Sequence, residues 1–162
     1  MGNQTFGVIV STRNCFPSHH VRTARVGIME LLGKLGHDYV IVSETDTRLG
    51  AVMTLGEAKV AADLFKKHRS KISGIIVVLP NFGEELGIAE AIDRANLGVP
   101  ILIQACDDDF DKLDIANRRD AFCGKISLCN NLIQRGIPFT LTAMHTCALD
   151  SDEFRADVQR FA

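Results

Sequence analysis

The sequence predicts one α/β domain of three layers, with a parallel β-sheet between two layers of helices. Two observations carry this prediction. Short apolar segments rich in β-branched residues alternate, about five times, with segments whose apolar residues recur at helical spacing. The strand-like segments, of which GIIVVL at 74–79 is the clearest, are apolar without alternation, as expected of strands that are covered on both faces.

The expected strands cover residues 6–10, 39–42, 74–79, 100–103 and 138–141. Each is separated from the next by a segment long enough for a crossover helix, so neighbouring strands run parallel with right-handed connections. The spacing suits a flavodoxin-like five-stranded sheet of order 2-1-3-4-5.

The helices have recognisable starts and ends. The first is expected over residues 21–35 and ends at Gly36, which is a typical C-cap. Thr54 and Glu57 have the spacing of a capping box, which predicts a second helix that runs to about residue 68. The remaining helices are expected at residues 84–95, at about 120–135, and from about 150 to the end of the chain.

The helix at 120–135 has an apolar stripe that we expect to face the core. On a helical wheel this stripe contains Phe122, Ile126, Cys129 and Ile133, with Leu132 beside it. Cys123 falls on the more polar side. The helix N-terminus and nearby basic residues favour a reactive thiolate there, but no histidine is placed by the sequence to act as its base.

Composition and charge exclude several classes of protein. The net charge of −2 does not favour nucleic acid or an anionic membrane surface as a partner, because both require a basic face. The N-terminus does not have the pattern of an export signal, and no apolar run is long enough to span a bilayer. The five cysteines form an irregular set without C-x-x-C spacing, which indicates free thiols and a cytoplasmic location.

Ligands of open α/β sheets bind at the carboxyl ends of the strands where the strand order reverses. That rule selects the loops at 11–18 and 80–85. Glutamates at 84 and 85 are also explained by the positive end of a helix dipole, and a solvated arginine and a packed loop phenylalanine remain the simpler interpretation of these loops. The candidate ligand-binding residues in the two loops are Arg13, Asn14, Phe16, Asn81 and Phe82.

The helix start near residue 120 adds further polar groups. Arg118, Arg119 and Lys125, together with free N–H groups, suit a hydroxyl-rich or weakly anionic ligand, or the surface of another subunit. A flavin is disfavoured, because the chain has no Trp and one Tyr to sandwich its ring. No cluster of His, Cys, Asp and Glu has metal-ligand spacing, so no metal site is expected in this chain.

Three motifs carry a resemblance to a known family. They are RNCFP at 13–17, LPNFGEE at 79–85 and RRDAFCGKIS-x-CNNL at 118–132. In this order the chain resembles the N-terminal region of the L-fucose/L-arabinose isomerase superfamily, and it is closer to the fucose-isomerase-like members.

The resemblance implies an aldose–ketose isomerase that uses a divalent metal, usually Mn²⁺, bound by two acidic residues and a histidine in later domains. It implies a homo-oligomer, a trimer or hexamer, in which the N-terminal domain closes over a neighbouring subunit's active site. This chain would then contain no catalytic and no metal-binding residue. Its candidate residues would contact the sugar, L-fucose, L-arabinose or a related one, from the neighbouring subunit.

The sequence departs from the pattern of that superfamily at two places. It stops at Ala162 within an expected helix, so we expect residues 1–162 to be the N-terminal domain of a longer isomerase. Phe122-Cys123-Gly124-Lys125 stands where arabinose isomerases have a sugar-contacting histidine, which makes L-arabinose a poorer candidate. The alternative function is a non-catalytic sugar-binding or interaction module that resembles half of a periplasmic binding protein.

Overall fold

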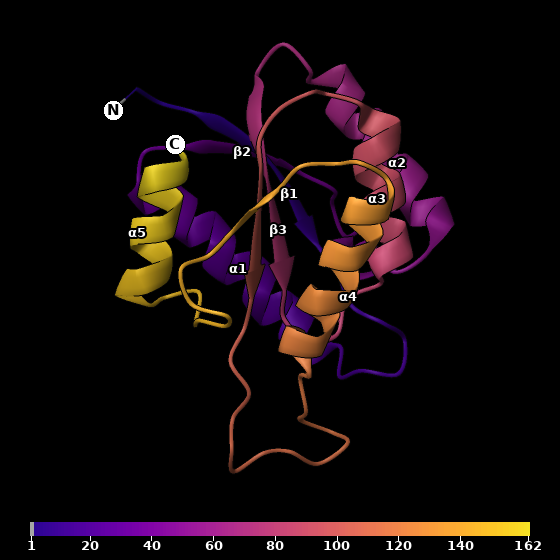
Figure 1. Ribbon diagram of the computed structural model, residues 1–162, viewed down its shortest axis with the longest axis vertical. Helices are drawn as coiled ribbons and strands as arrows, with labels where there is room; N and C mark the ends of the chain where they lie inside the picture. Colours follow the sequence, from indigo (N-terminus) through magenta and orange to yellow (C-terminus); the bar gives the residue numbers. More distant parts are fainter. Residues whose placement is uncertain (1) are drawn as a thin grey trace.

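The computed structural model describes residues 2–162 and has the expected three layers (Figure 1). Five parallel strands form one sheet of order β2-β1-β3-β4-β5. The prediction of the fold class and of the strand order is therefore confirmed. The strands are β1 (Thr5–Val10), β2 (Asp38–Ile41), β3 (Ile72–Leu79), β4 (Ile101–Ala105) and β5 (Thr140–Leu141).

Five α-helices cover the two faces of the sheet. They are α1 (His19–Lys34), α2 (Leu55–Lys67), α3 (Glu85–Ala95), α4 (Ala121–Gln134) and α5 (Asp152–Phe161). Helices α1 and α5 lie on one face, and α2, α3 and α4 lie on the other (Figure 1). Within the described part of the chain, no helix combines the length and the apolar character that crossing a membrane requires.

Strand β3 shows why a strand without alternation is covered on both faces. Ile75 and Val77 pack in the core beneath α2, α3 and α4, whereas Ile76 and Val78 pack in the core beneath α1 and α5. All four side chains are buried, because successive residues of a strand point to opposite faces of the sheet. The apolar run therefore fixes β3 as the central strand.

The element boundaries differ little from expectation. Thr54 caps α2 as predicted, since its side chain accepts a hydrogen bond from the Glu57 N–H at 3.2 Å, while the Glu57 carboxylate accepts one from the Met53 N–H at 2.8 Å. Strand β5 is shorter than the four residues expected, because only Thr140 and Leu141 pair with β4. A short 3-10 helix at Arg48–Gly50, which was not expected, precedes α2.

The prediction of the core face of α4 is wrong. The buried residues of this helix are Ala121, Gly124, Lys125, Leu128 and Leu132. The stripe that was expected to be buried points outward, with Phe122, Ile126 and Ile133 exposed and Cys129 half-buried. The two stripes have the same helical period, and the inner one places its two small residues, Ala121 and Gly124, where the first turns of α4 approach the rest of the domain closely.

Candidate functional site

The candidate site lies at the carboxyl ends of the strands. It consists of the loop after β1 (residues 11–18), the loop after β3 (residues 80–84) and the segment that leads from β4 into α4 (residues 106–120). These are segments far apart in the sequence that the parallel sheet brings to one edge.

Ser11 links the loop after β1 to the loop after β3 by a hydrogen bond. Its hydroxyl donates a hydrogen bond to the Val52 carbonyl at 2.6 Å and accepts one from the Glu84 N–H at 2.9 Å, and the side chain is fully buried. A second link joins the backbones, because the Arg13 N–H donates to the Phe82 carbonyl at 3.0 Å. The loops are therefore held in one arrangement before any ligand binds.

Four side chains stack in a row across these loops. The Arg118 guanidinium lies 4.8 Å from the centre of the Phe16 ring, and the Arg13 guanidinium lies 4.1 Å from the centre of the Phe82 ring. Between them the two rings are 6.0 Å apart and nearly parallel, at 28°. Each arginine lies over an aromatic ring, where the quadrupole of that ring attracts a cation. We call these four residues the stacked row.

Carboxylates compensate the charge of Arg13. Its Nη2 donates to both Glu85 oxygens at 2.5 and 2.6 Å, and its Nε lies 3.9 Å from Glu84. Burial, and then the neighbouring Glu85 charge, raise the pKa of Glu84, whereas Arg13 acts in the opposite direction. Arg13 therefore contributes an oriented, half-buried surface rather than an unpaired positive charge.

Arg119 joins the segment before α4 to the loop after β3. Its guanidinium donates to the Pro80 carbonyl at 2.8 Å, and its own carbonyl accepts from the Phe82 N–H at 2.7 Å. The Arg119 and Asp120 N–H groups both donate to the Asp108 carboxylate, at 3.2 and 3.1 Å. Arg119 was predicted to bind a ligand, and this stays a prediction. In the structure its side chain stabilises the loop after β3 through the hydrogen bond to the Pro80 carbonyl.

The two asparagines predicted at the site differ in their surroundings. Asn81 is 0 % exposed, and its amide donates to the Pro17 carbonyl at 3.2 Å, while its Oδ1 has no hydrogen-bond partner. Asn14 is exposed and accepts a hydrogen bond from Arg48 at 3.1 Å. A buried carbonyl oxygen without a donor is unusual, and because Asn81 is 0 % exposed its predicted contact with a ligand stays a prediction.

Gly124 explains the glycine at the start of α4. A Cβ atom at this position would lie 3.0 Å from the Phe82 Cα and 3.1 Å from the Gly83 nitrogen. Both neighbours are backbone atoms that would have to shift by a few tenths of an ångström to admit a Cβ, so glycine favours the close approach of α4 to the loop after β3. The helix thereby sets the position of Phe82.

Lys125 was predicted to contact a ligand or another subunit at the start of α4, but the structure buries its side chain, so this contact stays a prediction that the burial of Lys125 makes less favourable. The side chain is 3 % exposed, and its ammonium donates to Thr142 Oγ1 at 2.7 Å and to the carbonyls of His145 at 2.9 Å and Met144 at 3.4 Å. Burial lowers the pKa of Lys125. The residue joins α4 to the segment after β5 through these three hydrogen bonds.

Sequence reasoning missed a pocket of about 390 Å³ beside the stacked row. Arg119 lines both. His20 lies in its wall with its Nε2 2.8 Å from the Asn117 carbonyl, and burial lowers the pKa of His20, which favours the neutral imidazole. The only signal in the sequence was the rule that carboxyl ends of strands converge. The other polar lining residues are Thr23, Glu30, Cys106, Asp107 and Asp150.

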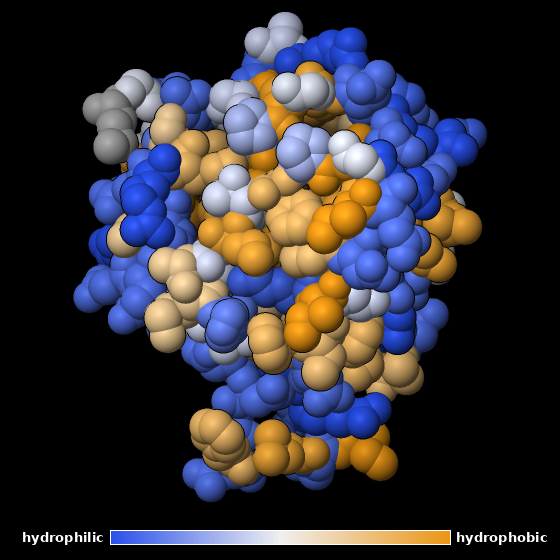
Figure 2. Space-filling model, in the orientation of Figure 1, coloured by the Kyte–Doolittle hydropathy of each residue, from blue (hydrophilic) through white to orange (hydrophobic). Residues whose placement is uncertain are grey.

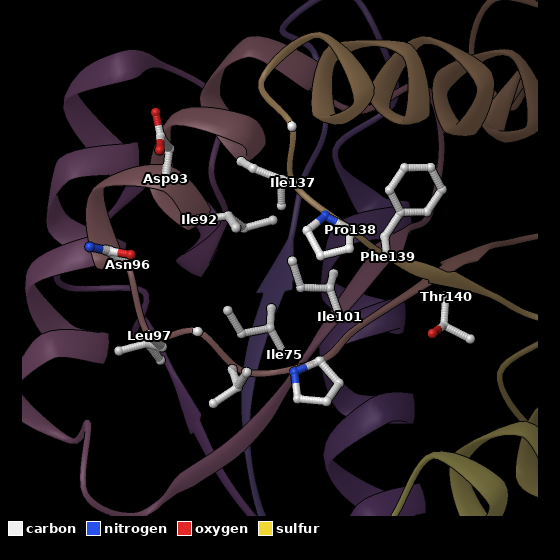
Figure 3. Close-up of a pocket in the computed structure, with 14 residues that line it drawn as sticks. Ile75, Ile92, Asp93, Asn96, Leu97, Ile101, Ile137, Pro138, Phe139 and Thr140 are labelled. Atoms are coloured by element: carbon white, nitrogen blue, oxygen red, sulfur yellow. The ribbon is translucent and has the colours of Figure 1, made fainter.

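A second groove, of about 500 Å³, opens at the opposite end of the sheet (Figure 3). Its walls come from the start of β3 and β4 and from the segment after α4, and they are mostly apolar, with Ile75, Ile101 and Phe139 among them. None of the predicted site residues lines this groove.

The manganese ion that the family resemblance implies has no fitting ligand set here. Among residues 2–162, no group of three or more His, Cys, Asp and Glu side chains is arranged to hold a metal ion. The side chains that the structure brings together at the site are aromatic rings, guanidinium groups and carboxylates.

Comparison with protein families gives a match over nearly the whole chain. The model of a family described as "fucose/sulfoquinovose isomerase, N-terminal domain" matches residues 7–162. No curated protein matches the chain. The match covers both loops of the candidate site and all of α4.

Proposed function

Because this chain belongs to the fucose/sulfoquinovose isomerase N-terminal domain family, we propose that it is the substrate-covering domain of an aldose–ketose isomerase. In this proposal the stacked row contacts the sugar while a neighbouring subunit of the same protein supplies the catalytic centre. The single observation that supports it is the stacked row itself, which lies at the edge of the sheet where ligands of such folds bind.

The stacked row has the chemistry that a sugar requires. A sugar has a C–H face, which packs on an aromatic ring, and hydroxyl groups, which accept hydrogen bonds from arginine side chains placed beside that ring. Phe16 and Phe82 are half-buried, so part of each side chain is accessible while the rest is held by the arginines.

The loops that carry the stacked row are held in place within the domain, which supports a role in positioning the sugar. Ser11, Arg119 and Gly124 fix the loops by hydrogen bonds and close packing. A covering surface that is already ordered loses little conformational entropy when it meets the substrate.

No described residues form a metal site, so no catalytic step is assigned to this chain. The divalent cation and the groups that move the proton belong, in this proposal, to other parts of the complete enzyme. Fucose and sulfoquinovose, which the family description names, are the first sugars to test. Fucose is neutral and sulfoquinovose carries a sulfonate, so the pair also reports on the use of Arg118.

The direct test is an NMR titration of the ¹⁵N-labelled chain with L-fucose, L-arabinose and sulfoquinovose. We expect amide shifts at Arg13, Phe82 and Arg119, and their loss in Phe82→Ala and Phe16→Ala. Leu86→Ala is the matched control, because Leu86 is exposed on the neighbouring α3 and is not part of the stacked row. Shifts confined to the pocket around His20, or no shifts with any sugar, would contradict the proposed site.

An isomerase assay of the complete protein with Mn²⁺ separates the two candidate functions. For a substrate-covering domain, Phe82→Ala raises KM by about tenfold, which corresponds to the loss of one aromatic contact. A complete protein that binds sugar at the stacked row but isomerises none of the three would be the alternative, a non-catalytic sugar-binding module.

A further inference from the structure

The pocket of about 390 Å³ beside the stacked row runs along helix α1. One wall is a stripe of α1 that contains His20, Ala24, Gly27 and Glu30, which lie on one side of the helix because they are three or four positions apart. The other walls come from the loop after β4 and from the segment before α5. His20 and Glu30 are ten residues apart, so the pocket follows about 15 Å of the helix. We call this space the His20 pocket.

Carboxylates outnumber cations in the walls of the His20 pocket. Glu30, Asp107 and Asp150 line it together with one guanidinium group, that of Arg119, which leaves an excess of two negative charges. Within residues 2–162, neither Asp107 nor Asp150 takes part in an ion pair. Burial raises the pKa of the Cys106 thiol, and the Asp107 and Asp150 charges raise it further. Both carboxylates therefore lie near Cys106, which also lines the pocket.

His20 adds a buried acceptor to the same pocket. The residue is 7 % exposed, and its Nε2 lies 2.8 Å from the Asn117 carbonyl. Because burial lowers the pKa of His20, its imidazole is neutral and has one N–H group. A carbonyl can only accept, so the hydrogen is on Nε2 and Nδ1 keeps a free lone pair. No group of residues 2–162 donates to this Nδ1, so it is an unused acceptor.

The pocket is apolar between His20 and Glu30. Ala24 and Gly27 lie between them on α1, and a Cβ atom at Gly27 would be 3.4 Å from the Leu149 Cδ1, so Leu149 packs beside this part of the helix. The pocket differs from the apolar area that Figure 2 shows across the middle of the face on which Figure 1 places β5 and α4, because acceptor groups stand at both ends of its apolar part.

We propose that the His20 pocket binds an aliphatic diamine, a molecule with a methylene chain and an ammonium group at each end. One ammonium group binds to Asp107 and Asp150 beside His20, and the other binds to Glu30. An ammonium group has three donors and no acceptor, which matches walls that offer carboxylates and a free imidazole nitrogen. The methylene chain packs on the apolar part of the pocket.

Glu30 is available to such a ligand. Its carboxylate lies 3.7 Å from the Lys34 ammonium, and both side chains are mostly exposed. An exposed ion pair of this kind is weak, so the ammonium group of a ligand can replace it. No residue of the stacked row lines the His20 pocket, so the inference is independent of the proposed sugar contact.

An NMR titration of the ¹⁵N-labelled chain with diaminooctane tests the inference. We expect amide shifts at His20, Gly27 and Leu149, and an affinity about tenfold higher than that of octanediol, which has the same carbon chain without charge. Diaminobutane is too short to reach from Asp150 to Glu30 and should also bind about tenfold more weakly. Glu30→Gln should weaken the binding of diaminooctane and leave that of diaminobutane unchanged.

Asp150→Lys and Asp111→Lys form a matched pair of variants. Both aspartates are exposed and both substitutions make the same change of charge, but Asp111 does not line the pocket. Asp150→Lys should weaken the binding of diaminooctane by about tenfold or more, whereas Asp111→Lys should weaken it by less than about twofold. Circular dichroism checks that both variants fold. Asp150→Asn, with an expected loss of about threefold, replaces Asp150→Lys if that variant does not fold.

Three outcomes would overturn the inference: no shifts at the pocket amides up to about 10 mM diaminooctane, an equal affinity for octanediol, or an equal loss in Asp150→Lys and Asp111→Lys. Its failure is distinguishable from that of the proposed function. Sugar shifts at Arg13 and Phe82 without diamine shifts would refute only the diamine site, and diamine shifts at His20 without sugar shifts would refute only the sugar contact.

Discussion

The inner and outer faces of α4 have the same helical period but differ in residue size, charge and exposure to solvent. The inner face has small residues, a buried lysine and two leucines, and it touches the loop after β3 through Gly124. The outer face has Phe122, Ile126 and Ile133 in contact with solvent. The spacing of apolar residues along a helix predicts on which sides of the helix they lie. It does not predict which of two such sides packs against the core, because that depends on tertiary packing.

Replacing a fully buried residue of the inner face, such as Lys125, should have the largest effect on this comparison. Lys125→Ala is expected to lower the free energy of unfolding by about 3 kcal/mol, since it opens a cavity and leaves the oxygens of Thr142 and His145 without their donor. Urea denaturation measures this change. Lys125→Met keeps most of the volume and should lose less. A loss below about 1 kcal/mol for Lys125→Ala would mean that the inner face tolerates an empty site.

Gly124→Ala tests the close approach of α4. Alanine favours a helix by about 1 kcal/mol over glycine, but its Cβ would press on the backbone at Phe82 and Gly83, so a net loss of about 1 kcal/mol is expected. Gly33→Ala in α1 is the control, because no atom lies within 4 Å of the added Cβ. It should gain about 1 kcal/mol. Equal responses of the two variants in thermal unfolding would contradict the role of Gly124.

The buried lysine also predicts a dependence of stability on pH. The folded-state pKa of Lys125 is lowered by burial, so the folded state binds fewer protons than the unfolded state between that pKa and the ordinary value of 10.5. Stability due to this residue should therefore rise with pH through that window. Burial raises the pKa of the Cys147 thiol to about 11, which has the opposite effect between pH 9 and 11.

Comparison with Lys125→Met separates the two contributions. Chemical denaturation of both proteins at pH 7 to 10.5 should show that the stability of the wild-type protein increases relative to that of Lys125→Met as the pH rises. A constant difference would mean that Lys125 has the same pKa in the folded and unfolded states.

The smallest effect is expected on the outer face. Ile126→Ser should change the stability of the monomer by no more than about 0.5 kcal/mol, because the side chain already contacts solvent. The inner Leu128→Ala should lose about 3 kcal/mol, since Leu128 is fully buried. Measuring both at a concentration where the chain is monomeric gives the contrast directly. Similar losses would mean that Ile126 is covered within one chain.

Much of the fold could be predicted from the sequence, because its helices and strands follow from patterns of neighbouring residues. The apolar run of β3, the capping box at Thr54 and the alternation of elements fixed the layers and the strand order. The same topology placed the loops of Arg13 and Phe82 at one edge, and the structure joins them by a hydrogen bond and a cation–π contact. Their role in binding sugar stays a prediction.

By itself, the sequence determined which segments form strands and helices and which loops meet, because periodicity and capping are properties of a residue and its neighbours along the chain. Only the tertiary structure decided that Lys125 is buried, that Arg118 stacks on Phe16 and that the larger apolar stripe of α4 faces outward. The reason is steric. Two stripes of one helix share the same period, and the stripe that contains Gly124 faces inward, where a Cβ atom at this position would lie only 3.0 Å from the Phe82 Cα.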